Sequence, residues 1–320
     1  MDSLLIEKIK VKIKQIREKM STFDAYFTKG LELYENKKYK LSIELFKIAL
    51  SQSNSQDFAN YNLALAYQQI NNDDEALIYY EKFLKFYPKD QSALYNTALI
   101  YFNKEDYKNA AKYFLTCFEK EQNKKNVVAL TKCYTKLEEI EKLQDLADYA
   151  LNSKCKDECV FEIAKTIEEE YEISNPEYLE IALNIYSKLY EEDKNNFDVT
   201  LSLSKVFSKK GDWKSAIKYC IKALDINPKS YEANNQLGLT YYCSEDMDSC
   251  IYYYEKAFKL NSKTDYRIYS NLAYAYEQVG KTDAAINLFK DLIVKFPNCP
   301  IKDNIKEHTK MLIQQQKEIV

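Results

Sequence analysis

Apolar residues recur along this chain at intervals of three and four positions, and they do not alternate with polar residues. One run places Ala76, Tyr80 and Leu84 four residues apart. This spacing puts the apolar side chains on one face of an α-helix, whereas a half-buried strand would need alternation. The pattern therefore predicts a chain built of amphipathic helices.

The helical pattern also repeats along the chain. The spacing that begins at Ala76 returns 34 residues later at Ala110, and it recurs after steps of 106 (about three periods), 34 and 35 residues at Ala216, Cys250 and Ala285. A second apolar run precedes each of these blocks, and in the first case it contains Leu63, Ala64 and Tyr67. Each period of about 34 residues therefore predicts two helices joined by a short turn.

This unit resembles the tetratricopeptide repeat, which joins leucine, a small residue and tyrosine on its first helix to alanine, an aromatic residue and a terminal proline on its second. Gly30 and Gly238 fall at the small-residue position of the first helix, and Gly211 and Gly280 fall at the turn between helices. Three prolines end second helices: Pro88, Pro228 and Pro297. The resemblance implies an all-α fold, a right-handed α-solenoid of about eight helix-turn-helix repeats with terminal capping helices.

We expect five segments along the chain. They are an N-terminal amphipathic helix at 1–22, three regular repeats at 23–123, two divergent repeats at 124–195, three regular repeats at 196–298 and a C-terminal capping helix at 299–320. The divergent segment contains an insertion near 173–176. It is interpreted either as a hinge or change of superhelix pitch, or as drift in a structural spacer.

The N-terminal segment carries its own apolar pattern. Five residues follow one another in steps of three and four: Ile6, Ile9, Ile13, Ile16 and Met20. This is the spacing of a coiled-coil seam, and the other faces are rich in lysine. Three interpretations stay open: a cap for the solenoid, a docking helix that would allow a homodimer through residues 1–20, or a basic helix lying on an anionic membrane.

Composition narrows the functional classes. Only four glycines and five prolines occur, too few for strand-rich folds or phosphate-binding loops. The only arginines are Arg17 and Arg267, so no nucleic-acid partner is expected. No apolar run reaches the roughly 18 residues of a membrane-spanning helix. The start MDSLLIEKIK does not resemble a secretory signal, and the eight scattered cysteines resemble buried fillers, so a cytoplasmic location is expected.

The residues that usually carry catalysis are scarce. Phosphate-loop, zinc-protease and serine-hydrolase motifs are absent from the sequence, which has a single histidine, His308. We expect His308 to have a structural role on the apolar face of the C-terminal cap. Cys155 and Cys159 could meet on one helical turn, but packing is favoured over a metal clip because further ligands are missing nearby. The chain is predicted not to be an enzyme, with no cofactor and no metal.

In the proteins that this chain resembles, the first helices of the repeats line a concave groove that binds peptides or helices of partner proteins. Carried over position by position, the resemblance implies these groove residues: Tyr61, Asn62, Leu65, Tyr95, Asn96, Leu99, Asn235, Gln236, Arg267, Asn271 and Tyr274. One repeat position holds an amide in four repeats (Asn62, Asn96, Gln236, Asn271), and resembles the asparagine ladder by which some family members grip a peptide main chain. The alternative is that these amides only decorate helix surfaces.

The resulting hypothesis is a protein–protein interaction scaffold that binds a peptide or helical segment of a partner protein in its groove. Alternatives are a regulator whose solenoid changes curvature when a peptide binds, and an adaptor that self-associates through the N-terminal helix. The lysine and asparagine set of co-chaperones that clamp a terminal carboxylate is incomplete here, so that specialisation is not favoured. Alanine at both Asn62 and Asn96 is expected to weaken binding without changing thermal stability.

Overall fold

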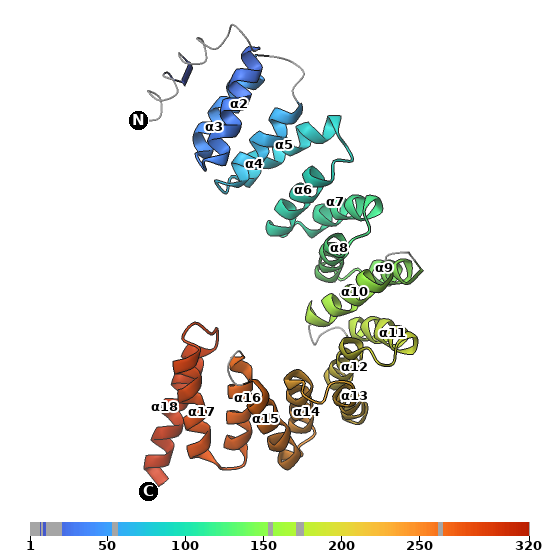
Figure 1. Cartoon of the computed structure of the whole chain (residues 1–320), viewed down its shortest axis with the longest axis vertical. Coiled ribbons are helices and arrows are strands. Elements are labelled where there is room, and N and C mark those ends of the chain that lie inside the picture. The colour runs from blue at the N-terminus through green and yellow to red at the C-terminus, as the bar shows by residue number, and fades with distance from the viewer. Residues whose placement is uncertain are drawn as a thin grey trace. The chain divides into compact units, whose positions relative to one another are not determined.

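The computed structural model describes residues 7, 9–10, 21–52, 57–152, 156–170, 176–261 and 265–319. Within these ranges the chain forms helices α2 to α18 and no strand (Figure 1). The first helices of the pairs are α2 (Thr22–Glu35), α4 (Asp57–Gln68), α6 (Gln91–Asn103), α8 (Lys124–Lys136), α10 (Lys156–Glu170), α12 (Phe197–Lys209), α14 (Tyr231–Cys243) and α16 (Tyr266–Gln278). The second helices are α3 (Tyr39–Leu50), α5 (Asp73–Phe86), α7 (Tyr107–Lys120), α9 (Ile140–Asn152), α11 (Glu177–Glu192), α13 (Trp213–Ile226), α15 (Met247–Asn261) and α17 (Thr282–Lys295), and α18 (Lys302–Ile319) follows them.

The helices belong to two compact units, residues 1–146 with 154–159 and residues 147–153 with 160–320. In the first unit α2 packs on α3, α4 on α5 and α6 on α7, and each pair also packs on the next helix in the chain. In the second unit the same holds for α12 with α13, α14 with α15 and α16 with α17. These antiparallel pairs confirm the predicted all-α solenoid of helical repeats.

Short polar residues cap the start of many of the helices. Asn72, Asp106 and Asp212 precede α5, α7 and α13, and the side chain of each accepts a hydrogen bond from a backbone N–H of the first turn. Asp90 and Ser230 do the same for α6 and α14. Each cap satisfies an N–H that has no partner within its helix. The polar residues between the apolar runs therefore mark where helices start.

The turn inside seven of the pairs places one residue in the left-handed region of backbone conformation. Gly211 has φ of 77° and Gly280 has φ of 74°, which confirms that these glycines lie at the inter-helix turn. In five other pairs a residue with a side chain adopts the same conformation: Lys37, Asn71, Glu105, Glu138 and Glu245. Because a Cβ atom disfavours this conformation, these turns cost free energy that the two glycine turns do not.

Replacing Glu105 by glycine is therefore expected to raise the free energy of unfolding by about 0.5–1 kcal/mol, because φ of 61° is strained for glutamate and not for glycine. Urea denaturation followed by circular dichroism measures the change. Alanine at the same position is the matched control, since it removes the carboxylate but keeps the Cβ. An equal gain in both variants would contradict this explanation.

Aromatic pairs recur within the repeats. Four pairs of rings twelve residues apart stack almost in parallel with centroids 5.4–5.7 Å apart: Tyr67–Tyr79, Tyr101–Tyr113, Phe207–Tyr219 and Tyr241–Tyr253. In each pair one ring comes from the first helix and the other from the second. The repeated spacing of twelve residues is visible in the chain, but the stacking itself depends on how the two helices pack. They account for part of its high tyrosine content.

The C-terminal helix α18 covers the last pair of the second unit. Ile305 and Leu312 of α18 are buried in a cluster with Ala285 and Phe289 of α17. This is the apolar face that the sequence predicted for a cap. Helix α18 thus covers apolar surface of α17 that would otherwise meet water.

Two predictions concern residues outside the described ranges. Apart from residues 7, 9 and 10, the N-terminal segment 1–20 lies outside them, and so do residues 173–175 of the insertion. Pro176 directly precedes α11. A search of the described helices finds none that combines the length and the apolar character needed to span a membrane.

Candidate functional site

The predicted groove residues of the first unit lie on α4 and α6. Tyr61 of α4 is half-buried, and its ring packs against Tyr80 and Phe83 of α5 at centroid distances of 5.8 and 5.2 Å. Leu65 and Tyr95 also pack, partly buried, against the apolar core of this unit. Burial raises the pKa of Tyr61 and of Tyr95. These side chains thus belong to the core on one side and remain partly accessible on the other.

A buried tyrosine ties two amides of these helices together. The hydroxyl group of Tyr80 donates a hydrogen bond to Oε1 of Gln68 in α4 and accepts one from Nδ2 of Asn96 in α6 at 3.0 Å. The Tyr80 side chain is fully buried, and burial raises its pKa above the usual value. The network joins α4, α5 and α6, so the Asn96 amide holds neighbouring repeats together.

Asn62 has a different partner. Its Nδ2 donates to the backbone carbonyl of Phe58, one turn earlier in α4, at 2.8 Å. This bond stays within one helix and within reach of solvent. The two amides of the first unit are therefore not equivalent, although they occupy the same position of the repeat. The hydrogen bond from Asn96 to a buried hydroxyl changes the expectation for this residue, because its replacement by alanine is now predicted to lower thermal stability.

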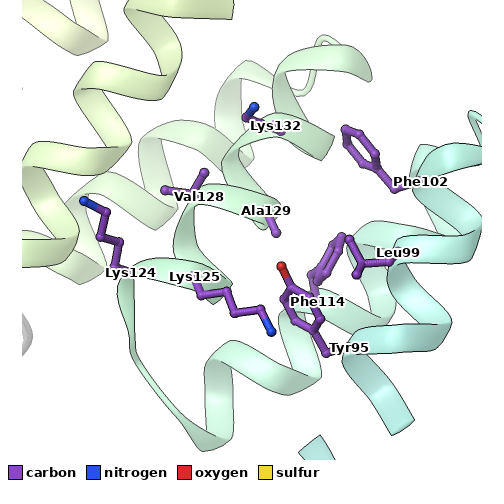
Figure 2. A pocket seen from close by; sticks show the side chains of 9 residues that line it. All are labelled: Tyr95, Leu99, Phe102, Phe114, Lys124, Lys125, Val128, Ala129 and Lys132. Carbon is purple, nitrogen blue, oxygen red and sulfur yellow. The ribbon is translucent and has the colours of Figure 1, made fainter. Parts of the chain in front are cut away.

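A cavity of about 520 Å³ opens between α6, α7 and α8 of the first unit (Figure 2). Tyr95, Leu99 and Phe102 of α6 line one side, and Phe114 of α7 lies behind them. The rings of Tyr95 and Phe114 meet edge to face at 5.2 Å. Two of the predicted groove residues, Tyr95 and Leu99, are thus brought together at a cavity with an apolar wall.

The other side of the cavity is formed by α8 and carries positive charge. Lys124, Lys125 and Lys132 line it together with Val128 and Ala129, and the nine lining residues include no carboxylate. The Lys125 ammonium lies 3.4 Å from the centroid of the Tyr95 ring, a cation–π contact. These residues were not among the predicted groove residues, because they lie in a repeat without the family markers. The seven-residue spacing of Lys125 and Lys132, which puts them on one helical face, was the available signal.

In the second unit, two predicted residues contact each other. Nδ2 of Asn271 in α16 donates to Oδ1 of Asn235 in α14 at 3.0 Å, so amides of successive first helices join directly. Gln236, one residue further along α14, is buried at 9% exposure. Little of this side chain therefore lies on an open surface, unlike the partly exposed Asn62 and Asn271 at the same repeat position.

Arg267 of α16 forms an ion pair with the residue that caps the start of its own helix. Its guanidinium makes two parallel contacts with the Asp265 carboxylate, Nε to Oδ1 at 3.0 Å and Nη2 to Oδ2 at 2.8 Å. Asp265 also caps α16 by accepting from the backbone N–H of Arg267. The arginine side chain stays 68% exposed. One of the two arginines in the chain thus pairs with a neighbouring cap residue.

The last predicted residue, Tyr274, packs against the C-terminal cap. Its ring lies 5.1 Å from Phe289 and 5.5 Å from the ring of His308 in α18. Nε2 of His308 lies 2.8 Å from Oε2 of Glu277 in α16. The only histidine therefore links the cap to a first helix, a structural role, and it does so through a polar contact as well as its apolar neighbours.

Most of the described cysteines are buried. Burial raises the pKa of Cys133, Cys220 and Cys250 to about 12, so these thiols stay protonated at neutral pH. Cys243 is exposed, contrary to the expectation of buried fillers, and Cys155 lies outside the described residues. The described part of the chain holds no group of three or more His, Cys, Asp or Glu side chains that could bind a metal ion.

Models of known families match several parts of the chain. Models described as tetratricopeptide repeat match residues 27–90, residues 200–230 and 231–264, and residues 268–297. A model described as subunit 3 of the anaphase-promoting complex, or cyclosome, matches residues 69–142. The repeat matches fall on helix pairs of both units.

A curated relative is a TPR repeat-containing protein of Methanocaldococcus jannaschii, 25% identical over 88% of this chain. The chain spans 57% of the length of that relative. Among solved structures, a tetratricopeptide repeat protein of Parabacteroides merdae covers 91% of this chain and 98% of its own at 14% identity and a TM-score of 0.47. A thermophilic TPR protein of Thermus thermophilus covers 70% of this chain and all of its own at 14% identity and a TM-score of 0.42. From its helix pairs and these sequence matches, the chain is a tetratricopeptide-repeat protein.

Proposed function

We propose that this protein is a scaffold that binds an extended or helical segment of a partner protein on the surface formed by its first helices. Tetratricopeptide-repeat proteins are in general interaction scaffolds, and the segment-binding mode proposed here is more specific. The observation that carries the proposal is the cavity of the first unit, where Tyr95, Leu99 and Phe102 present an apolar wall next to lysines.

Apolar surface of this kind favours association. Each square ångström removed from water contributes about 25 cal/mol, and aromatic rings provide large contact areas at small entropic cost. The volume of about 520 Å³ lies within the range of about 300–1,000 Å³ typical of ligand pockets. A side chain of a partner could therefore fill the cavity while its backbone runs along α6.

The predicted groove residues outside the cavity contribute less to the proposed binding. Tyr61, Asn62 and Leu65 lie one repeat before the cavity and would extend the contact along the segment. In the second unit, Asn235, Asn271 and Tyr274 remain proposed contacts, whereas the Asn96 amide supports the framework through Tyr80. Binding in the first unit is therefore assigned to the cavity wall more than to an amide ladder.

Replacing Leu99 by serine is expected to weaken partner binding roughly tenfold, because the variant loses apolar contact area at the wall. Partners are captured on the intact protein and identified by mass spectrometry, and the purified partner is then titrated by calorimetry. The matched control is Leu115→Ser, which changes a leucine that is 37% exposed on α7 and does not line the cavity.

Melting temperatures of both variants separate loss of binding from loss of folding. The proposal requires that a partner bound by the wild type and by Leu115→Ser is lost from Leu99→Ser while that variant stays folded. Equal affinity of the two variants for the same partner would contradict a site at this cavity.

A further inference from the structure

We infer that the cavity of the first unit recognises an acidic segment of a partner, one that inserts a large apolar side chain beside α6 and places a side-chain carboxylate against Lys125 of α8. This inference rests on the proposed function and adds the chemistry of the partner.

The positive charge of the cavity lining is the reason to expect carboxylates on the partner segment. Three lysines, Lys124, Lys125 and Lys132, lie on one side of the cavity, and the nine lining residues carry no negative charge. Opposite charges at an interface steer association and select among partners, and like charges are repelled. Lys124 and Lys132 already interact with other groups of the chain, so the charge that a partner would meet lies mainly at Lys125. A basic segment would meet like charge there, so the lining favours an acidic one.

The position of the lysines at the start of α8 also favours a negatively charged ligand. Lys124 and Lys125 are the first two residues of the helix, where the aligned peptide dipoles already leave partial positive charge. Cations at this end are unfavourable for the helix by itself, and no acidic residue occupies its first turn. A carboxylate of a partner placed at Lys125 would reduce the repulsion between this ammonium and the helix dipole, so binding and the local stability of α8 would favour each other.

Lys125 is also held in place. Its ammonium lies 3.4 Å from the centroid of the Tyr95 ring, and that ring packs edge to face on Phe114. A cation fixed over an aromatic face loses less conformational freedom when a carboxylate approaches it. The same ring forms part of the apolar wall, so an apolar side chain and an adjacent carboxylate of one segment would both contact the pair formed by Tyr95 and Lys125.

The apolar wall sets the second requirement. Leu99 and Phe102 of α6 and Phe114 of α7 face the cavity without polar side-chain groups. A purely acidic segment would leave this wall in contact with water, whereas an aromatic or large aliphatic side chain would cover it. The preferred segment therefore combines both kinds of residue, and its carboxylates belong to side chains, so a free chain end is not needed.

The experiment selects random peptides on the full chain by phage display and then measures the affinity of the enriched sequences as synthetic peptides with amidated C-termini. Fluorescence anisotropy reports binding at low and at high salt. The expected peptides combine aspartate or glutamate with a large apolar residue, and their affinity falls as salt rises, since screening weakens the attraction between exposed charges.

Reversing the charge of a lysine in the cavity lining tests whether that lysine contacts the acidic residues of the peptide. Lys125→Glu is expected to weaken binding of the selected acidic peptides roughly tenfold or more. The matched control is Lys112→Glu, which makes the same charge change at an exposed position of α7 outside the cavity lining. Circular dichroism melting curves verify that each variant is folded.

The outcomes separate this inference from the proposed function. Acidic peptides that Lys125→Glu weakens and Lys112→Glu does not would support it. Selected peptides without acidic residues, or acidic peptides equally affected by both variants, would overturn the inference and leave segment binding intact. If no peptide binds the folded chain above background, the inference and the proposed binding of segments both fail.

Discussion

Replacing Gly238 by valine is expected to lower the free energy of unfolding by about 3 kcal/mol. A Cβ atom at Gly238 would lie 2.5 Å from Cδ1 of Tyr254 and 2.8 Å from its Cε1. The Tyr254 ring is buried at 2% exposure inside the pair formed by α14 and α15, so it has no free space into which to move. Helix α14 or α15 would have to shift, and contacts on both sides of the pair would be lost.

Urea denaturation measures the overall change, and amide hydrogen exchange shows whether the loss is centred on α14 and α15, as expected for repeats that contact mainly their neighbours. The control is Leu239→Val in the same helix, where the side chain is 37% exposed. Valine there is expected to cost only about 0.5 kcal/mol through its lower helix propensity. Equal losses at the two positions would show that close packing against Tyr254 is not what demands glycine.

Replacing Asn96 by alanine is expected to cost about 1–3 kcal/mol of stability, because the buried Tyr80 hydroxyl then loses the donor at 3.0 Å. Asn62→Ala is the matched control, since it removes the same amide from the same repeat position. Its hydrogen bond to the Phe58 carbonyl is solvent-accessible, so we expect a cost within about 0.5 kcal/mol. Chemical denaturation of both single variants gives the comparison.

A double-mutant cycle tests the cause. Tyr80→Phe in the Asn96→Ala background removes the hydroxyl that has lost its donor, so the second change is expected to cost less there than in the wild type. Additive losses would indicate that Tyr80 and Asn96 stabilise the unit independently. A large loss on Asn62→Ala would contradict the distinction between the two amides.

The repeat pattern explains why so much of the fold was predictable. An apolar spacing of three and four residues requires helices, and a period of about 34 residues requires that each pair meets its neighbours in the same way. Gly30 and Gly238 illustrate this, because in each case an added Cβ would collide with an aromatic ring of the paired helix, Phe46 or Tyr254. A local pattern repeated along the chain is enough to determine local packing.

The candidate site was less predictable for a physical reason. The repeat positions that line the groove in the family identified Tyr95 and Leu99. The lysines opposite them lie on α8, where the marker residues of the family are absent. A cavity depends on which side chains two consecutive repeats bring together, and the repeat pattern does not contain that information. The exposed Cys243 and the buried Gln236 differ from expectation for a related reason, since a repeat position does not by itself set burial.

By itself, the sequence determined the all-α repeat architecture, the apolar face of the C-terminal helix and the glycine turns, because each depends on spacing and on backbone chemistry within about one period. Only the tertiary structure decided that Asn96 supports Tyr80, that Asn235 meets Asn271, and that Lys125 lies over Tyr95 at a cavity. These contacts join side chains from different helices, and their partners depend on rotamers and on packing between repeats. The chemistry that would select a partner therefore arises from the packed repeats and not from the repeat motif.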